Sequence, residues 1–173
     1  MSFSWLGSTP ARRVWAIILI AFVVRGVCVL GQPLIGADSS RFLAAAELIE
    51  GGEQHQAVRQ DYHPLPAFVF ATANRMQGWF LSDSGATQEP NAFQADQSRR
   101  ERAAYLLTIL AGALSVWLLI DLTRRWFVQV PPELVGLFAA FHPYLVRTSA
   151  DIMSDGLFIA LFLLALRQGD EAI

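Results

Sequence analysis

Acidic residues and a histidine recur where the apolar stretches of this chain begin or end. Asp38 follows the first apolar stretch after a short break, His63 stands directly before a Pro-Leu-Pro sequence, and Asp151 and Asp155 flank the start of the last apolar stretch. A carboxylate in such a place can accept a proton from a hydroxyl nucleophile or stabilise an oxocarbenium-like sugar carbon. The pattern therefore suits group transfer at a membrane face.

Basic residues that suit an anionic ligand precede another apolar stretch. Arg99, Arg100 and Arg102 stand there, and Arg102 is the nearest of them to the apolar residues. Negative charge builds on a departing phosphate as a glycosidic bond breaks, and the planar guanidinium group binds phosphate through two parallel hydrogen bonds. We expect Arg102 to contact a phosphate, and Arg99 and Arg100 to be solvated.

The composition predicts a membrane protein. Hydrophobic residues make up 54% of the 173 residues and charged residues only 16%, whereas soluble domains carry about 25% charged residues. The apolar residues lie in blocks, which is typical of membrane spans. The net charge is −2, all thirteen basic residues are arginine and there is no basic tail, so nothing indicates nucleic-acid binding. The single cysteine, Cys28, excludes an internal disulfide.

Four apolar stretches approach the length that crosses a bilayer. They are residues 14–30, 103–122, 132–146 and 152–167. The first follows Arg12 and Arg13 as a signal sequence would, but no small-residue cleavage site comes after it, so we predict an uncleaved span. Within it, Arg25 either extends to the interface or faces a polar cavity.

Two further helices are predicted to lie on the membrane surface, at residues 38–51 and 64–81. In the first, Asp38 has the chemistry of an N-cap, four apolar residues fall on one face, and two glycines end the helix. These residues are Phe42, Ala45, Ala46 and Ile49, with Gly51 and Gly52. The second helix contains Arg75, and burying an arginine near the middle of a bilayer costs about 2.5–3.5 kcal/mol. A span at 64–81 is therefore the less favoured alternative.

Polar connections separate these elements. Residues 82–102 are rich in Gln, Ser and Asp and predict a loop. Residues 147–151 predict a short turn in which Asp151 is solvated. The pair His142 and Pro143 interrupts the third span and predicts a break at that point.

Charges beside the spans predict the orientation. With 64–81 outside the bilayer, the arginine pairs at 12–13 and 124–125 and Arg167 share one side, which is the cytoplasmic side. The acidic motifs, His63 and Arg102 then share the other side. We predict an all-α polytopic membrane helix bundle of four transmembrane and two juxtamembrane helices, a single domain over 1–173, in the plasma (inner) membrane with a cytoplasmic N-terminus.

The order of these motifs resembles the first part of the GT-C glycosyltransferases, especially the protein O-mannosyltransferases and the lipid A aminoarabinose transferases. Such enzymes have an acid after the first span and then an His-Pro-Pro-Leu-like motif. A span with small residues follows, then an Arg-Arg-aromatic turn, and finally Pro, Ser and a second Asp. The matching residues here are Asp38, His63, Pro64, Leu65, Thr108, Gly112, those at 124–127, Pro143, Ser149 and Asp155.

The resemblance implies transfer of a sugar from a polyprenyl-phosphate donor to an extracytoplasmic acceptor hydroxyl. It implies Asp38 and Asp155 as catalytic residues, and a substrate-binding set of His63, Arg102, Tyr105, Arg41 and Asp151. Each main candidate also has a purely structural interpretation. Asp38 can be an N-cap, His63 a turn residue and Asp155 a carboxylate that reaches the membrane interface. The expected partners are membrane lipid, the lipid-linked sugar and an unidentified acceptor.

The chain departs from the family pattern in three respects. Pro-Leu-Pro replaces Pro-Pro without a lysine beside His63, and Tyr105 stands where the family tends to place arginine, so Arg102 is the expected substitute. Family members are several times longer, so we expect either the N-terminal portion of a longer module or a chain that works only with a partner, inactive alone in both cases. The alternative is a non-catalytic membrane protein, either a transporter fragment or an assembly subunit. Transporters place ionisable groups at the middle of their spans, whereas here they gather at one face, which favours the enzyme.

No metal-ligand spacing is present. Asp151 and Asp155 are four residues apart, and two acids alone make a weak metal site. We predict neither a metal nor a cofactor, because the lipid-linked sugar is itself a substrate.

Overall fold

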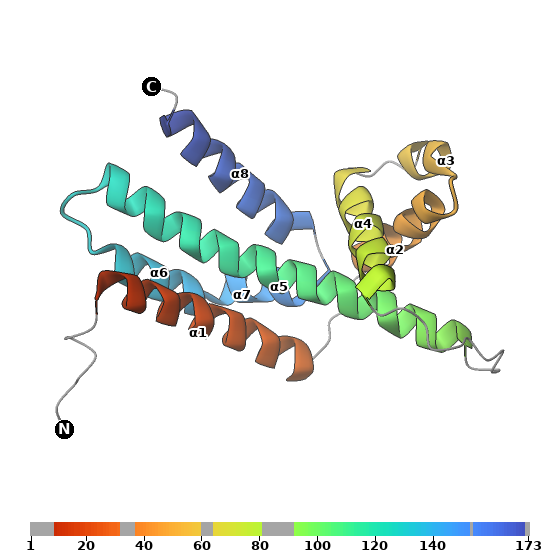
Figure 1. Ribbon diagram of the computed structural model, residues 1–173, viewed down its shortest axis with the longest axis horizontal. Coiled ribbons are helices and arrows are strands. Elements are labelled where there is room, and N and C mark those ends of the chain that lie inside the picture. Colours follow the sequence, from red (N-terminus) through yellow and green to blue (C-terminus); the bar gives the residue numbers. More distant parts are fainter. Residues whose placement is uncertain (1–8, 32–36, 60–63, 81–91, 153, 172–173) are drawn as a thin grey trace.

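Helices are the regular secondary structure in the part of the chain that the structure describes, and short turns join several of them. This computed structural model describes residues 9–31, 37–59, 64–80, 92–152 and 154–171 (Figure 1). The helices are α1 (Pro10–Gly31), α2 (Ala37–Glu50), α3 (Gln54–Arg59), α4 (Pro64–Phe80), α5 (Ala92–Trp126), α6 (Pro132–Phe141), α7 (Pro143–Ala150) and α8 (Ser154–Glu171). The predicted all-α class is confirmed.

Helix α5 is the central element. It has 35 residues and contacts α1, α4, α6, α7 and α8 (Figure 1). Helix α1 runs beside it in the opposite direction, and α6 and α7 together return along α1 and α5. A cluster of buried apolar side chains joins α1, α5 and α6. Its members are Val14, Ile17, Ala21, Val116, Ile120, Ala139 and Ala140.

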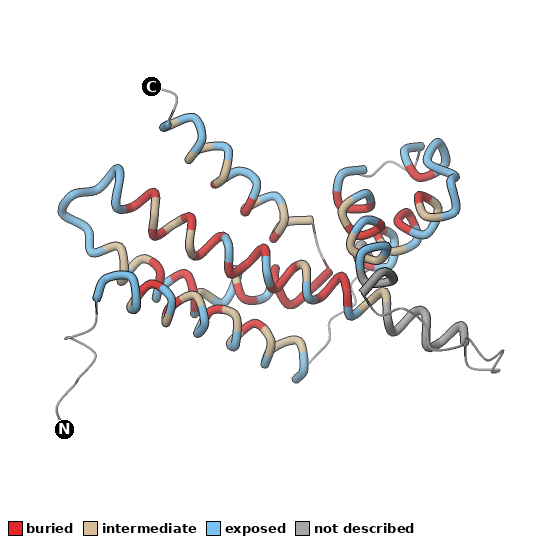
Figure 2. Tube along the Cα trace, in the orientation of Figure 1, coloured by how far each residue is buried: buried red, intermediate tan, exposed pale blue. Residues whose placement is uncertain are grey.

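Two of the described helices are long and apolar enough to cross a membrane. They are α1 and the Arg100–Trp126 part of α5. Helix α1 buries a narrow stripe against its neighbours and exposes the rest (Figure 2). Its exposed side includes Trp15, Leu19, Val23, Val27 and Leu30. Water would make this a costly surface, whereas lipid solvates it without penalty.

Helices α2, α3 and α4 pack together beside the N-terminal half of α5, at one end of the other helices (Figure 1). The face predicted for α2 is buried, with Phe42, Ala45, Ala46 and Ile49 all at most 5% exposed. Helix α4 packs mainly on α2 and α5. Helix α3 has no counterpart in the sequence prediction, because its six residues carry no apolar period.

Gly52 ends α2 as the glycine pair predicts. Its φ is +85°, a left-handed conformation that glycine adopts without strain. Around it, the Gly52 N–H donates to the Ile49 carbonyl at 3.2 Å and the Glu53 N–H donates to the Leu48 carbonyl at 2.8 Å. These two bonds satisfy carbonyls that the helix end leaves open.

Two predicted connections are wrong. Helix α5 begins at Ala92 rather than near residue 103, because the polar residues before the span are good helix formers and no glycine or proline separates them from it. Residues 147–150 are not a turn but the end of α7. There the Thr148 and Ser149 hydroxyls donate to the Leu145 carbonyl at 3.2 and 2.9 Å, so the helix itself satisfies them.

The predicted break at His142 and Pro143 is present. His142 is extended between α6 and α7, and Pro143 begins α7. Because proline has no N–H, the carbonyl of Ala139 has no partner four residues later. A partner therefore has to come from another element.

Arg25 of α1 supplies the hydrogen-bond donor for the Ala139 carbonyl. Its side chain is only 1% exposed, so it does not extend to an interface. The guanidinium group donates to the carbonyls of Ala139 and Ala140, each at 3.4 Å, to the Ala21 carbonyl at 3.0 Å and to Ser149 Oγ at 3.3 Å. Among the residues that the structure describes, no carboxylate pairs with it. Arg25 therefore joins α1 to both sides of the α6–α7 break.

Gly112→Ala is expected to lower the free energy of unfolding by about 1–3 kcal/mol, as overpacking does. An added Cβ would collide with Ser149 Oγ and lie 2.5 Å from Arg25 Nε, and both side chains are held by hydrogen bonds. Gly26→Ala is the matched control, since nothing lies within 4 Å of a Cβ there. Thermal unfolding in detergent compares the two, and equal stabilities would contradict the packing described here.

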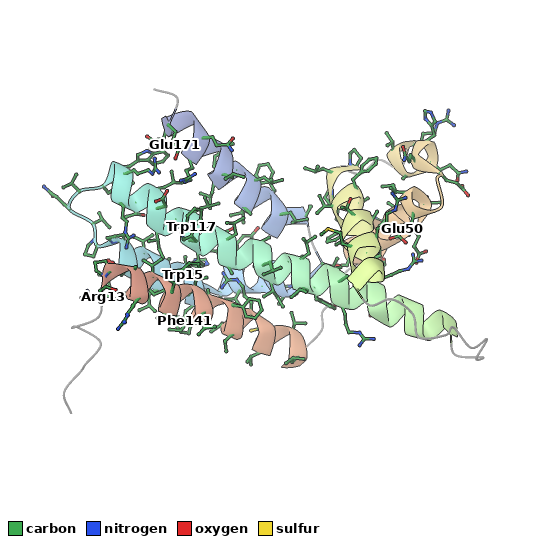
Figure 3. All side chains as sticks on the ribbon, in the orientation of Figure 1. Arg13, Trp15, Glu50, Trp117, Phe141 and Glu171 are labelled. Carbon is green, nitrogen blue, oxygen red and sulfur yellow. The ribbon has the colours of Figure 1, made fainter. Side chains whose placement is uncertain are left out.

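Ion pairs join the far end of α5 to α8. Glu171 of α8 lies near this end of α5 (Figure 3). The Asp121 carboxylate accepts from Arg125 at 3.1 Å and from Arg167 at 2.9 Å, and Arg125 also pairs with Glu171 at 3.1 Å. The Arg167 guanidinium lies 5.5 Å from the Trp117 ring centroid. Arg124, Arg125 and Arg167 thus lie at one end of the molecule, away from α2 and α4.

Candidate functional site

One buried hydrogen bond connects the start of α2 to the segment between α7 and α8. Ser39 Oγ donates to Asp151 Oδ1 at 2.7 Å across 112 residues of sequence. Ser39 is 0% exposed and Asp151 is 8% exposed. The expectation that Asp151 is solvated is therefore wrong, because the packing of α2 against this segment covers it.

Tyr105 of α5 belongs to the same region. It is buried in a cluster with Phe42 and Ala46 of α2 and with Ile152, which directly follows Asp151. Its phenol group lies within electrostatic range of the Asp151 carboxylate. Helices α2 and α5 and the α7–α8 connection therefore bring Ser39, Tyr105 and Asp151 together.

Asp155 lies in the first turn of α8, on the wall of a pocket between α4 and α8. The Tyr144 hydroxyl donates to Asp155 Oδ2 at 3.5 Å. The pocket has a volume of about 390 Å³ and is mainly apolar. Its lining residues are Pro64, Leu65, Pro66, Val69, Ser154, Asp155, Leu157, Phe158 and Leu161. The Pro64-Leu65 part of the histidine motif and Asp155 thus meet at one cavity.

Two predicted residues lie wholly or partly outside what the structure describes. His63 is outside the described residues, and of Asp38 only the backbone is described. Helix α2 begins at Ala37, so Asp38 lies in its first turn rather than at the N-cap position. Since Ser39 follows Asp38 directly, the Ser39 bond places the α2 turn that carries Asp38 next to Asp151.

The two arginines predicted to bind substrate lie apart from the pocket wall. Arg41 on α2 and Arg102 on α5 are exposed, and neither lines the pocket. Among the lining residues that the structure describes, Asp155 is the one ionisable group. This lining suits an apolar chain and a group that a carboxylate can deprotonate.

Sequence reasoning missed Ser39 and Tyr144. For Ser39 a signal existed, because a serine stands at helical spacing with Phe42, Ala46 and Ile49 on an otherwise apolar stripe. No comparable signal marked Tyr144, whose partner Asp155 lies on a different helix.

The described residues contain no group of three or more His, Cys, Asp or Glu side chains placed to hold a metal ion. At this site the structure places a carboxylate at an apolar pocket, beside a buried hydroxyl–carboxylate pair. Comparison of the chain with protein-family models, with curated proteins and with solved structures gave no match.

Proposed function

We propose that this protein is a GT-C-type glycosyltransferase that moves a sugar from a polyprenyl phosphate to an acceptor hydroxyl outside the cytoplasm. The observation that carries the proposal is the apolar pocket between α4 and α8, with Asp155 on its wall. The bond from Ser39 to Asp151 supports it, because it brings the α2 turn of Asp38 to the segment that leads to Asp155. Three motifs far apart in the sequence thereby share one end of the molecule.

The proposed membrane topology has four spans: α1, α5, α6 with α7, and α8. The length and composition of α1 and α5 support two of them, and the exposed apolar side chains of α6 and α8, among them Phe138 and Phe162, support the others. A proline break inside a span is tolerated where another helix satisfies the freed carbonyls, as Arg25 does. Arginines at 124–125 and 167 then face the cytoplasm by the positive-inside rule.

In the proposed reaction, the bond between the anomeric carbon and the phosphate oxygen breaks as the acceptor oxygen bonds to that carbon. The acceptor proton passes to a carboxylate, for which Asp38 and Asp155 are the candidates. The products are the glycosylated acceptor and the free polyprenyl phosphate. Arg41, Arg102, Tyr105 and His63 are the candidates for holding the phosphate and the sugar, outside the apolar pocket that takes the lipid chain.

The test is sugar transfer by the full-length gene product in proteoliposomes. Polyprenyl-phosphate mannose and polyprenyl-phosphate aminoarabinose serve as radiolabelled donors, with a membrane extract as the source of acceptors. Label is expected in the acceptor fraction with at least one donor, together with release of polyprenyl phosphate. Failure of both donors, with the protein folded and inserted, would contradict the proposed activity.

One observation favours a second candidate, a non-catalytic membrane subunit that holds a lipid chain. Within the described part of the chain, the residues that line the pocket include no basic side chain to meet a phosphate, and a lipid chain alone needs none. The same proteoliposomes separate the two functions. Saturable retention of an uncharged polyprenol without any transfer of sugar would identify the subunit, whereas transfer identifies the enzyme.

A further inference from the structure

Ser39 forms a short hydrogen bond at a buried position, where an apolar side chain would cost less free energy to bury. It lies on the buried stripe of α2 that continues through Phe42 and Ala46, and it is fully buried. Burying a hydroxyl costs free energy unless a partner is present. The neighbouring stripe positions Ala45 and Ala46 show that alanine fits this surface. Packing alone therefore does not account for the hydroxyl.

The partner of that hydroxyl is a carboxylate. The distance from Ser39 Oγ to Asp151 Oδ1 is 2.7 Å, within the range of about 2.5–2.7 Å that is usual for a hydroxyl donating to an ionised carboxylate. Asp151 is also the C-cap of α7, and its N–H donates to the Arg147 carbonyl at 3.1 Å. Both the side chain and the backbone of Asp151 are thus fixed.

The bond determines how two separate turns lie relative to each other. Asp38 directly precedes Ser39 in the first turn of α2, and Asp155 follows Asp151 by four residues in the first turn of α8. The Ser39–Asp151 bond is a direct polar link between these segments. A shift of about 1 Å between two catalytic groups can change a rate a hundredfold.

We propose that Ser39 is a positioning residue, whose hydroxyl fixes Asp151 and so sets the distance between the turns that carry Asp38 and Asp155. This inference rests on the proposed transferase activity. Ser39 itself contacts no substrate. Its removal is expected to change the rate of the chemical step more than the binding of the donor.

Ser39→Ala is therefore expected to lower kcat for sugar transfer by about ten- to a hundredfold, with little change in KM for the polyprenyl-phosphate sugar. Ser39→Thr keeps a hydroxyl in this position and is expected to restore most of the rate. Thr123→Val is the matched control, because it removes a buried hydroxyl whose described hydrogen bond lies within its own helix, to the Leu119 carbonyl at 2.6 Å. The control is expected to keep the wild-type kcat.

The outcomes separate this inference from the activity on which it rests. Wild-type kcat in Ser39→Ala, or a loss that Ser39→Thr does not restore, would overturn the positioning role while leaving the transferase in place. A wild-type protein that transfers neither sugar refutes the activity, and the role of Ser39 with it. If Ser39→Ala does not fold, Ser39→Cys fills nearly the same space with a weaker donor, and the same split between kcat and KM is expected.

Discussion

Asp155→Asn is expected to reduce sugar transfer roughly a thousandfold, the scale of losing a positioned general base. Asparagine has the shape of aspartate but cannot accept a proton from the acceptor hydroxyl. It still accepts the hydrogen bond from Tyr144 that the carboxylate now accepts at 3.5 Å, so the first turn of α8 is expected to keep its place. Asp38→Asn is expected to have an effect of similar size.

The measurement is the initial rate of label transfer in proteoliposomes that contain equal amounts of folded protein. Glu53→Gln is the matched control, because it neutralises an exposed carboxylate in the turn between α2 and α3 and is expected to retain the wild-type rate. Unchanged transfer by Asp155→Asn would remove this residue from the catalytic set. Equal losses in all three variants would mean that surface charge, rather than a site, governs the rate.

Arg25→Met is expected to lower the free energy of unfolding by about 2–4 kcal/mol. Methionine fills much of the same space but leaves the carbonyls of Ala139 and Ala140 without the donor that now reaches them. Each unsatisfied buried carbonyl costs about 1–3 kcal/mol, and relief of the buried charge offsets part of the total. In thermal unfolding, the loss corresponds to a Tm lower by roughly 5–10 °C.

Two variants make this result specific. Arg12→Met removes an exposed arginine near the start of the same helix and is expected to leave Tm unchanged. Arg25→Lys keeps the charge but replaces a fork of donors by one ammonium group, so an intermediate loss is expected. A Tm for Arg25→Met equal to that of the wild type would show that the α6–α7 break does not depend on Arg25.

Local patterns predicted the elements that depend on local physics. The buried face of α2, the glycine stop at Gly52 and the break at His142 each follow from residues within a few positions of one another. Helix spacing, the left-handed conformation of glycine and the missing N–H of proline suffice for these.

Contacts between distant segments were beyond the same reasoning. Arg25 had two open interpretations, and only the packing of α6 and α7 on α1 shows that it meets carbonyls more than one hundred residues away. Asp151 was expected in solvent because its neighbours in sequence are polar, yet α2 covers it. In both cases segments that are distant in the sequence bury the polar side chain. The residues adjacent to it in the sequence do not predict that burial.

The pocket that Pro64, Leu65 and Asp155 share is another contact between distant segments that local patterns do not predict. The sequence places both motifs beside apolar stretches, and the shared cavity requires α4 and α8 both to pack on α5. The proposed role of Asp38 depends on a turn whose backbone lies beside Asp151 through the Ser39 bond. The site is thus a product of helix packing around α5 rather than of any single motif.

The most direct measurement is thiol labelling from one side of the membrane. In a Cys28→Ala background, Asp38→Cys, Asp155→Cys and Trp126→Cys are made singly and treated in intact cells with a membrane-impermeant maleimide. Labelling is expected at positions 38 and 155 in intact cells, and at position 126 only after permeabilisation. Labelling of positions 38 and 155 from opposite sides would contradict a common site on one membrane face, and with it the proposed transferase.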